Sequence, residues 1–371
     1  MPASTAADPS TAALGPPSQL TAVAAKVEAR LDRLFQEQTT HWRALDPRLA
    51  EAIEELALVV GSGGKRLRAA FCYWAWRGRL DEAGSSSSAD NHEARVIDVG
   101  AAFELLQAFA LVHDDIMDDS ATRRGQPTVH MRQAQRLIDE SWRGEPRRFG
   151  EGVAILIGDL SHAYADQLMA GSSPAARRIW DDLRIELNLG QYLDLRSAAA
   201  GQLDWETAKR VSTFKSALYT IVRPLQLGAS LVGPADPLLM ARLDRYGRPL
   251  GRAFQLKDDL LGVLGDERQV GKPVGDDLRE GKPTELVALA MERTEGRPRR
   301  LLDGIGRRDL SADDVAAIVE VFRSSGAVDE IVARITQLVA EAVDAIAELP
   351  FCEESKRALA ALADYVAARN S

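Results

Sequence analysis

The sequence predicts an all-α protein: a single large helical bundle around a central cavity. Three observations predict this fold. Ala, Leu, Glu and Arg dominate the chain from about residue 21 onward, and apolar residues recur at spacings of three and four. Alternating β-branched segments between turn residues are missing from the sequence. We therefore expect a disordered tail over residues 1–20 and one all-α domain over residues 21–371.

The helical pattern is clearest in three segments. Residues 20–38 show it near the N-terminal end, and residues 314–326 and 328–349 show it near the C-terminal end. Ser311 lies just before the segment 314–326 and Gly326 ends it, and both are typical helix-capping residues. These signals predict that each segment is a separate helix.

Two polar stretches interrupt the helical pattern. Residues 79–95 read RLDEAGSSSSADNHEAR, and residues 139–152 read DESWRGEPRRFGEG. Their Gly, Ser, Pro and charged residues predict surface loops between helices rather than domain boundaries. The sequence shows no internal repeat at a solenoid period.

The composition excludes several classes of protein. Hydrophobic residues make up 46% of the 371 residues, and the net charge of −9 argues against a nucleic-acid or anionic-membrane binder. The N-terminal segment lacks a signal-peptide pattern, and no apolar run reaches the roughly 18 to 20 residues that cross a bilayer. Two cysteines, Cys72 and Cys352, cannot form a disulfide framework, which favours a cytoplasmic location.

A first acidic cluster follows an apolar segment directly. Residues 101–112 read AAFELLQAFALV, and the chain then continues HDDIMDDS. Asp114, Asp115 and Asp118 would share one helix face, where they would repel one another without a counter-ion. An isolated aspartate pair, as at 181–182, is more often a solvated surface. A buried helix makes these aspartates better candidates for Mg²⁺, which leaves coordination positions for water and phosphate.

A second acidic cluster has the same character. Residues 254–266 read FQLKDDLLGVLGD, so Asp258 and Asp259 again follow apolar neighbours. If the two clusters face each other across a cavity, their carboxylates can hold several metal ions around one diphosphate. The pair of clusters therefore predicts a phosphorylated substrate.

Basic residues that could contact phosphate oxygens occur in four short stretches. They read GSGGKRLR (61–68), TRRGQP (122–127), FKSALY (214–219) and VGKPVGDDLREGKPT (270–284). The glycines before Lys65 allow the backbone to approach an anion closely, although the Ser or Thr of a P-loop is missing. One such stretch alone is usually an exposed surface, but the combination with two acidic clusters indicates a metal–diphosphate site.

The order of these motifs resembles the trans-isoprenyl diphosphate synthase family. GGKRLR, DDxxD with RRG, GDxL, GQxxD, KSA, FQxxDD and GKPxGDDxxEGKPT follow one another over nearly the whole chain after residue 20. The resemblance implies a short-chain prenyltransferase that condenses isopentenyl diphosphate with allylic diphosphates. It also implies three Mg²⁺ ions with diphosphate bound, and a homodimer.

The resemblance assigns a role to each matched residue. Those matched to isopentenyl diphosphate binding are Lys65, Arg68, Gln107 and Arg124. Those matched to Mg²⁺, and through it to the allylic diphosphate, are Asp114, Asp115, Asp118, Asp258 and Asp259. Those matched to direct contacts with the allylic diphosphate are Arg123, Lys215 and Lys272, with Lys282 as an addition. Ser216 and Gln255 match groups beside the developing carbocation.

One position departs from the family pattern. The second motif usually reads DDxxD, but its fifth position here is Gly262. Asp266 lies one turn further, about 6 Å along the helix axis, and is not expected to substitute fully. We therefore expect metal binding to survive in a weaker form.

The residues before the first acidic cluster bear on product length. Phe109 and Ala110 lie five and four positions before Asp114. Phe109 can form the floor of an apolar tunnel for the growing chain, which must be kept from water. This chain has one aromatic residue at these two positions and no insertion in the first acidic motif. In this respect it resembles synthases whose product is the twenty-carbon geranylgeranyl diphosphate, and the fifteen-carbon farnesyl diphosphate is the alternative product.

Three other functions share some of these sequence features. A class I terpene cyclase also uses DDxxD, but DDLLGVLGD lacks its second metal motif. An HD-type phosphohydrolase is suggested by His113 next to Asp114, but the other four histidines lack the spacing of further ligands. A non-catalytic subunit of a heteromeric prenyl synthase usually loses its acidic motifs, and both are present here. In the family the departing pyrophosphate takes the proton, so none of the histidines is required.

Overall fold

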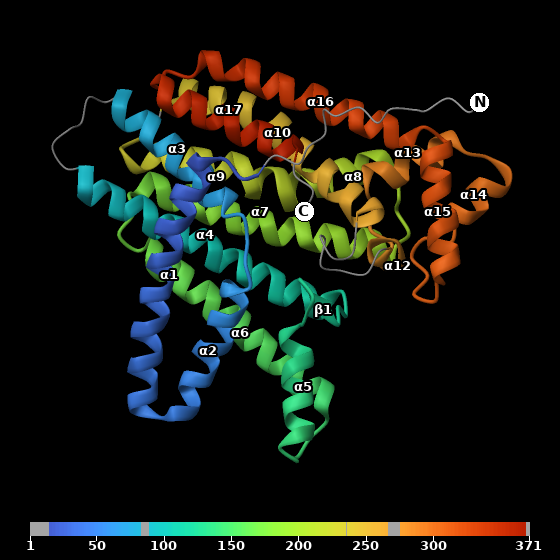
Figure 1. Cartoon of the computed structure of the whole chain (residues 1–371), viewed down its shortest axis with the longest axis horizontal. Coiled ribbons are helices and arrows are strands. Elements are labelled where there is room, and N and C mark those ends of the chain that lie inside the picture. Colours follow the sequence, from blue (N-terminus) through green and yellow to red (C-terminus); the bar gives the residue numbers. More distant parts are fainter. Residues whose placement is uncertain (1–14, 83–88, 235, 266–274, 369–371) are drawn as a thin grey trace, which may run out of the picture.

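The computed structural model describes residues 15–82, 89–234, 236–265 and 275–368. These residues form helices and one short hairpin (Figure 1), so the predicted all-α fold is confirmed. In chain order the elements are α1 (Ser18–Leu45), α2 (Pro47–Gly61), α3 (Leu67–Glu82), α4 (Ala89–Met117), β1 (Thr122–Arg123), β2 (Gln126–Pro127), α5 (Val129–Asp139), α6 (Pro146–Met169), α7 (Pro174–Ala199), α8 (Trp205–Val211), η1 (Ser212–Val222), α9 (Arg223–Leu231), α10 (Pro237–Leu264), α12 (Asp276–Glu280), α13 (Glu285–Arg293), α14 (Gly296–Leu302), α15 (Ala312–Ser324), α16 (Ala327–Ala345), η2 (Ile346–Glu348) and α17 (Glu353–Ala368).

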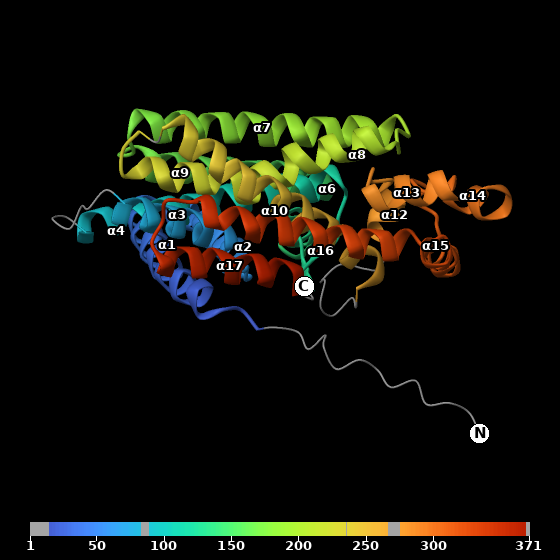
Figure 2. The ribbon, with the colours of Figure 1, turned by 90° about the horizontal axis from the view of Figure 1, so that it is seen from above.

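The helices stack in layers, as Figure 2 shows. α7 and α8 form one outer layer, α6, α9 and α10 lie beneath them, and α1, α16 and α17 lie on the opposite side. α4 packs mainly on α6, α3 on α9, and α10 on α16 and η1. Two apolar clusters fill the interior, one around Tyr246 and Phe322 and the other around Phe103 and Trp180.

Helix ends follow ordinary capping chemistry. Ser311 and Asp314 form a reciprocal capping box at the start of α15, which confirms Ser311 as a cap. Gly326, between α15 and α16, has a φ of 73°, a backbone conformation that glycine adopts at little cost. Asp46 caps α2 and is followed by Pro47, whose fixed φ suits the first helical position.

Three predicted boundaries were wrong because helices extend further than expected. α1 begins at Ser18, inside the predicted tail, and residues 1–14 of that tail lie outside the described residues. The predicted loop 79–95 contains the end of α3 and the start of α4. In the predicted loop 139–152, the Glu145 side chain accepts hydrogen bonds from the backbone of Arg147 and Arg148, so α6 already begins at Pro146.

A short hairpin was not predicted. Thr122 pairs with Pro127 and Arg123 with Gln126 in the antiparallel strands β1 and β2. The turn between them contains Arg124 and Gly125, both with positive φ. Two residues per strand are too few to produce a recognisable alternating pattern.

α4 also meets the length and composition of a membrane span over residues 93–117. Of its most apolar window, 61% is buried inside the protein, as is usual for the core helix of a large domain. Burial against α6 and α1 therefore accounts for its apolar character.

Candidate active site

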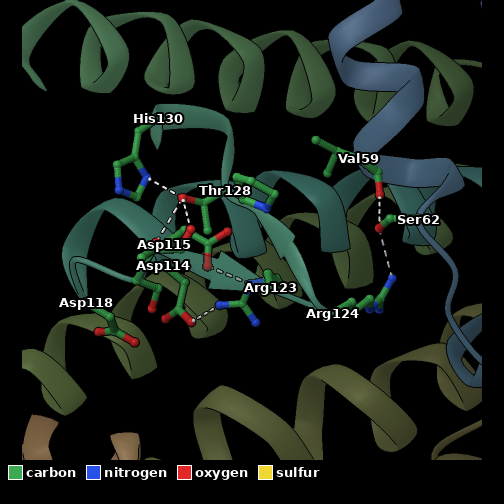
Figure 3. Close-up of polar contacts among 12 residues, drawn as sticks. Val59, Ser62, Asp114, Asp115, Asp118, Arg123, Arg124, Thr128 and His130 are labelled. Atoms are coloured by element: carbon green, nitrogen blue, oxygen red, sulfur yellow. Dashed lines mark hydrogen bonds and ion pairs between the residues drawn. The ribbon is translucent and has the colours of Figure 1, made fainter. Parts of the chain in front are cut away.

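The first acidic cluster lies where α4 ends and the β1–β2 hairpin begins (Figure 3). Asp115 is 4% exposed and accepts a 2.6 Å hydrogen bond from Arg123 Nε, whose terminal Nη2 lies 3.4 Å from Asp114. Burial opposes the charge of Arg123, but Asp115 and Asp114 outweigh it and raise the pKa of the guanidinium. The hairpin thus holds a permanent cation against two carboxylates.

The helix η1 brings a second cation to Asp114. Lys215 Nζ lies 2.7 Å from Asp194 of α7 and 3.2 Å from Asp114. Burial opposes the charge of Lys215, but Asp114 and Asp194 raise its pKa above the usual value. η1 is a π-helix, a form that is frequent at functional sites.

α7 approaches η1 closely because it carries a glycine at the contact. A Cβ atom at Gly190 would lie 2.7 Å from the backbone nitrogen of Lys215, closer than real contacts allow. The neighbouring Gln191 donates a 2.9 Å hydrogen bond to Asp114. Gly190, Gln191 and Asp194 therefore fix both Lys215 and the first acidic cluster.

The second acidic cluster lies near the end of α10. Asp259 is 7% exposed and accepts a 2.6 Å hydrogen bond from Gln255 Nε2. Ser216 of η1 donates a hydrogen bond to the other end of the Gln255 amide. Burial raises the pKa of Asp259 well above its usual value, and the charges of Asp277 and Asp258 add to this effect. A nearby cation would therefore be strongly favoured.

Lys282 connects the first acidic cluster to the short helix α12. Its Nζ lies 2.6 Å from Glu280, 3.1 Å from Asp118 and 3.3 Å from Asp277. Burial opposes the charge of Lys282, but the nearby carboxylates, chiefly Asp277 and Asp118, raise the pKa of its ammonium group well above the usual value. This ammonium group is thus a counter-ion between Asp118 of the first cluster and the two carboxylates of α12.

Two cavities contain most of the predicted site. One, of about 360 Å³, is lined by residues of both acidic clusters, including Asp114, Asp258 and Asp259, and by Lys282. The other, of about 630 Å³, is lined by the glycine-rich loop and by apolar residues of α4 and α7. The residues that line both cavities are Leu111, Asp114, Arg124, Lys215, Ser216 and Asp258. The cavities are therefore adjacent, with the acidic clusters at their junction.

The larger cavity has a cationic end. Lys65, Arg68 and Arg124 line it together with Gln107. Burial, and then the charges of Arg123 and Arg66, lower the pKa of Arg124. Such crowding of like charges is relieved by an anion, so this end suits a phosphate group.

The apolar end of the same cavity contains Phe109. Its ring lies 4.7 Å from the ring of His113 and 5.0 Å from that of His162, centroid to centroid. His113 also lies 3.2 Å from the carbonyl oxygen of Ile155. These contacts hold the Phe109 ring in the cavity wall. His130, bonded to Thr128 (Figure 3), is buried and does not line either cavity.

Comparison with known proteins identifies the family. The polyprenyl synthetase family profile matches residues 48–322. A geranylfarnesyl diphosphate synthase of Aeropyrum pernix is 32% identical, over 84% of this chain and 92% of the relative. A geranylgeranyl diphosphate synthase of Mycobacterium tuberculosis is 34% identical, over 82% of this chain and 77% of the relative. This chain belongs to the polyprenyl synthetase family. The predicted family resemblance and the prenyltransferase class are thereby confirmed.

Solved structures agree with this assignment. The structure of a geranylgeranyl pyrophosphate synthase from Corynebacterium glutamicum, complexed with isoprenyl diphosphate and magnesium, superposes with a TM-score of 0.87. It is 36% identical in sequence, and the match covers 94% of this chain and 99% of that chain. A polyprenyl synthase from Caulobacter crescentus superposes with a TM-score of 0.78 at 28% identity.

The donor set of this polyprenyl synthetase fits Mg²⁺ in chemistry. Carboxylate oxygens are the protein ligands that this hard cation prefers. Within the described residues, no three such side chains converge on a single point. Arg123, Lys215 and Lys282 instead form ion pairs with the carboxylates.

Some predicted residues lie outside these cavities or outside the described chain. Lys272 and Asp266 fall in residues 266–274, which the structure does not describe. Asp115 and Asp118 do not line either cavity. Asp115 instead forms an ion pair with Arg123, and Asp118 forms one with Lys282, and both of these cations line the smaller cavity. Sequence analysis missed Asp194, although the GQxxD motif that contains it was a visible signal.

Proposed function

We propose that this prenyltransferase condenses isopentenyl diphosphate with allylic diphosphates and releases geranylgeranyl diphosphate as its main product. One observation carries the proposal: a cavity lined by both acidic clusters adjoins a second cavity with a cationic end and an apolar end. Two anionic substrates and one growing apolar chain need three such environments in contact.

The cationic end is the proposed subsite for isopentenyl diphosphate. Lys65, Arg68 and Arg124 supply positive charge, and Gln107 adds a hydrogen-bonding amide. Arg68 lies over the Tyr219 ring at 4.1 Å and donates a 3.2 Å hydrogen bond to Thr220. These contacts fix the direction of the guanidinium before the substrate arrives.

The junction of the cavities is the proposed subsite for the allylic diphosphate. When bound by Asp114, Asp115, Asp118, Asp258 and Asp259, Mg²⁺ (three ions in our proposal) supplies charge neutralisation for the leaving diphosphate. Arg123, Lys215 and Lys282 contact the same diphosphate directly after release from their carboxylates, and Lys272 is proposed to join them. Ser216 and Gln255 present oxygen atoms beside the carbon that becomes positive.

The apolar end is the proposed tunnel for the growing chain. Phe109, fixed by two histidine rings, forms its floor, and water is excluded along its length. Several relatives are named geranylgeranyl diphosphate synthases and two are named geranylfarnesyl diphosphate synthases. These names favour a product of twenty carbons or more over the fifteen-carbon farnesyl alternative.

We also propose a homodimer that forms through α6 and α7. α7 lies on the outside of the bundle in Figure 2. Large apolar side chains on these two helices are 46–65% exposed, namely Ile155, Leu156, Ile185, Leu189 and Tyr192. An apolar surface of this kind is typical of a protein–protein contact. Leu156→Glu with Leu189→Glu should yield monomers in sedimentation velocity, and an unchanged dimer would place the contact elsewhere.

Incubation of the purified protein with isopentenyl diphosphate, each allylic primer in turn and Mg²⁺ tests the proposed reaction. Mass spectrometry of the products should show elongation in five-carbon steps that stops mainly at twenty carbons. A cyclic hydrocarbon would indicate a terpene cyclase, and free phosphate would indicate a phosphohydrolase. No turnover with any primer would favour a non-catalytic subunit. A cytoplasmic location stays a prediction.

A further inference from the structure

The second acidic cluster lacks a carboxylate at its fifth position. Asp258 and Gly262 lie one helical turn apart on α10, and both line the 360 Å³ cavity. A residue at 262 therefore faces the same space as Asp258, but glycine contributes no side chain to it.

The structure fills this space from another helix. A Cβ atom at Gly262 would lie 2.3 Å from Oδ2 of Asp277 and 3.4 Å from its Cγ. Asp277 belongs to α12 and lines the same cavity as Asp258 and Asp259. Its carboxylate thus lies where a side chain at position 262 would begin.

Asp277 is oriented by its own segment. Its Oδ1 lies 3.3 Å from Lys282 Nζ, and its backbone oxygen accepts a 3.1 Å hydrogen bond from the Lys282 nitrogen. Because Oδ1 contacts Lys282, Oδ2 is the oxygen next to Gly262. The short helix and its following turn therefore hold this carboxylate against α10.

We infer that Asp277 supplies the third carboxylate of the second metal cluster in this chain. The inference rests on the proposed metal-dependent function. It also explains Gly262: the two positions share one space, which holds either a side chain on α10 or the carboxylate from α12.

A simpler alternative is that Asp277 serves only as a counter-ion for Lys282. Glu280 separates the two possibilities because it also pairs with Lys282, at 2.6 Å, but does not line the cavity. Asp277→Asn and Glu280→Gln each remove one counter-ion of Lys282 with little change of shape. Only the first of these variants removes a carboxylate that lines the cavity together with Asp258.

The experiment measures Mn²⁺ binding by electron paramagnetic resonance in the presence of inorganic pyrophosphate. Asp277→Asn should weaken the affinity for the bound ions about 10- to 100-fold, as loss of a metal-supporting group does. Glu280→Gln should weaken it far less, because Lys282 keeps Asp118 and Asp277 as partners and the cavity keeps its carboxylates. Circular dichroism checks that each variant is folded.

A reciprocal pair of variants tests the shared space. Gly262→Asp in the Asp277→Ala background should restore most of the Mn²⁺ affinity, because the new side chain enters the vacated space. In the unchanged background, Gly262→Ala should lower the affinity by pushing the Asp277 carboxylate aside. Neither outcome is expected if Asp277 serves Lys282 alone.

Two results would overturn the inference. The first is equal Mn²⁺ affinity in Asp277→Asn and Glu280→Gln. The second is a failure of Gly262→Asp to improve binding in the Asp277→Ala background. Asp258→Ala serves as the reference: if it loses the ions while Asp277→Asn keeps them, the inference fails and the proposed function stands. If Asp258→Ala also binds normally, the metal site itself is wrong.

Discussion

A buried ion pair holds the loop that carries Lys65 and Arg68, two residues of the proposed subsite for isopentenyl diphosphate. Arg66 and Glu104 are 6% and 5% exposed, and Arg66 Nη1 lies 2.7 Å from Glu104 Oε2. Arg66 also donates a 3.0 Å hydrogen bond to the carbonyl of Val60. Because Lys65 and Arg68 flank Arg66, the pair fixes the course of the loop that carries them.

Glu104→Leu should be strongly destabilising. Removal of Glu104 leaves the buried charge of Arg66 with only the half-exposed Glu28, 3.5 Å away, and breaking a buried ion pair in this way costs up to about 3–5 kcal/mol of the free energy of unfolding. Arg66→Met with Glu104→Leu removes both charges and should recover most of that loss. A residual cost of about 1–3 kcal/mol remains because the Val60 carbonyl loses its donor.

Urea unfolding at a fixed protein concentration measures these differences. The exposed pair of Arg245 and Glu348 provides the control, since Glu348→Leu should change the free energy of unfolding by less than about 1 kcal/mol. At a urea concentration where Glu104→Leu is still folded, its KM for isopentenyl diphosphate should rise more than that for the allylic primer. Equal destabilisation in Glu104→Leu and Glu348→Leu would refute the reasoning.

Three further perturbations test other parts of the site. Phe109→Ala should lengthen the main product by five-carbon units, and the same length in mass spectrometry would remove Phe109 as the tunnel floor. Gly190→Ala should raise KM for the allylic primer by pushing η1 and Lys215 away, whereas Gly152→Ala, with open space at its Cβ, should not. The pKa of Asp259 is raised by burial, so its contribution to stability is complete below its unfolded value of about 4 and is lost as pH rises through the folded value. Mg²⁺ competes with this proton, so its shift of the melting temperature should grow with pH over that window, and a shift independent of pH would count against Asp259 as a ligand.

Much of the site could be predicted because its residues occur in short, chemically unusual stretches. Asp114 and Asp115 follow an apolar helix, and their charge in such surroundings needs a counter-ion. The same is true of Asp258 and Asp259. Spacing on a helix was enough to place Asp114 and Asp115 on the same face as Asp118. The structure brings Asp114, Asp258 and Asp259 to one cavity, whereas Asp115 lies outside its lining.

Contacts between distant segments could not be read from the sequence. The pairing of Lys215 with Asp194 depends on the approach of η1 to α7, which Gly190 permits. The position of Asp277 next to Gly262 depends on how α12 returns to α10. The start of α6 was missed because a Gly- and Arg-rich stretch has weak helical signals, and the Glu145 cap outweighs them.

Turnover of Asp115→Ala and of Asp259→Ala, each measured with isopentenyl diphosphate and an allylic primer over a range of Mg²⁺ concentrations, tests the central claim most directly. Each variant should lose about a hundredfold or more in rate, because the charge on the leaving group is no longer neutralised from one side. Elongation should also stop when the divalent ion is chelated. Unchanged turnover in either variant, or elongation that continues after chelation, would contradict a site in which two acidic clusters hold one diphosphate through metal ions.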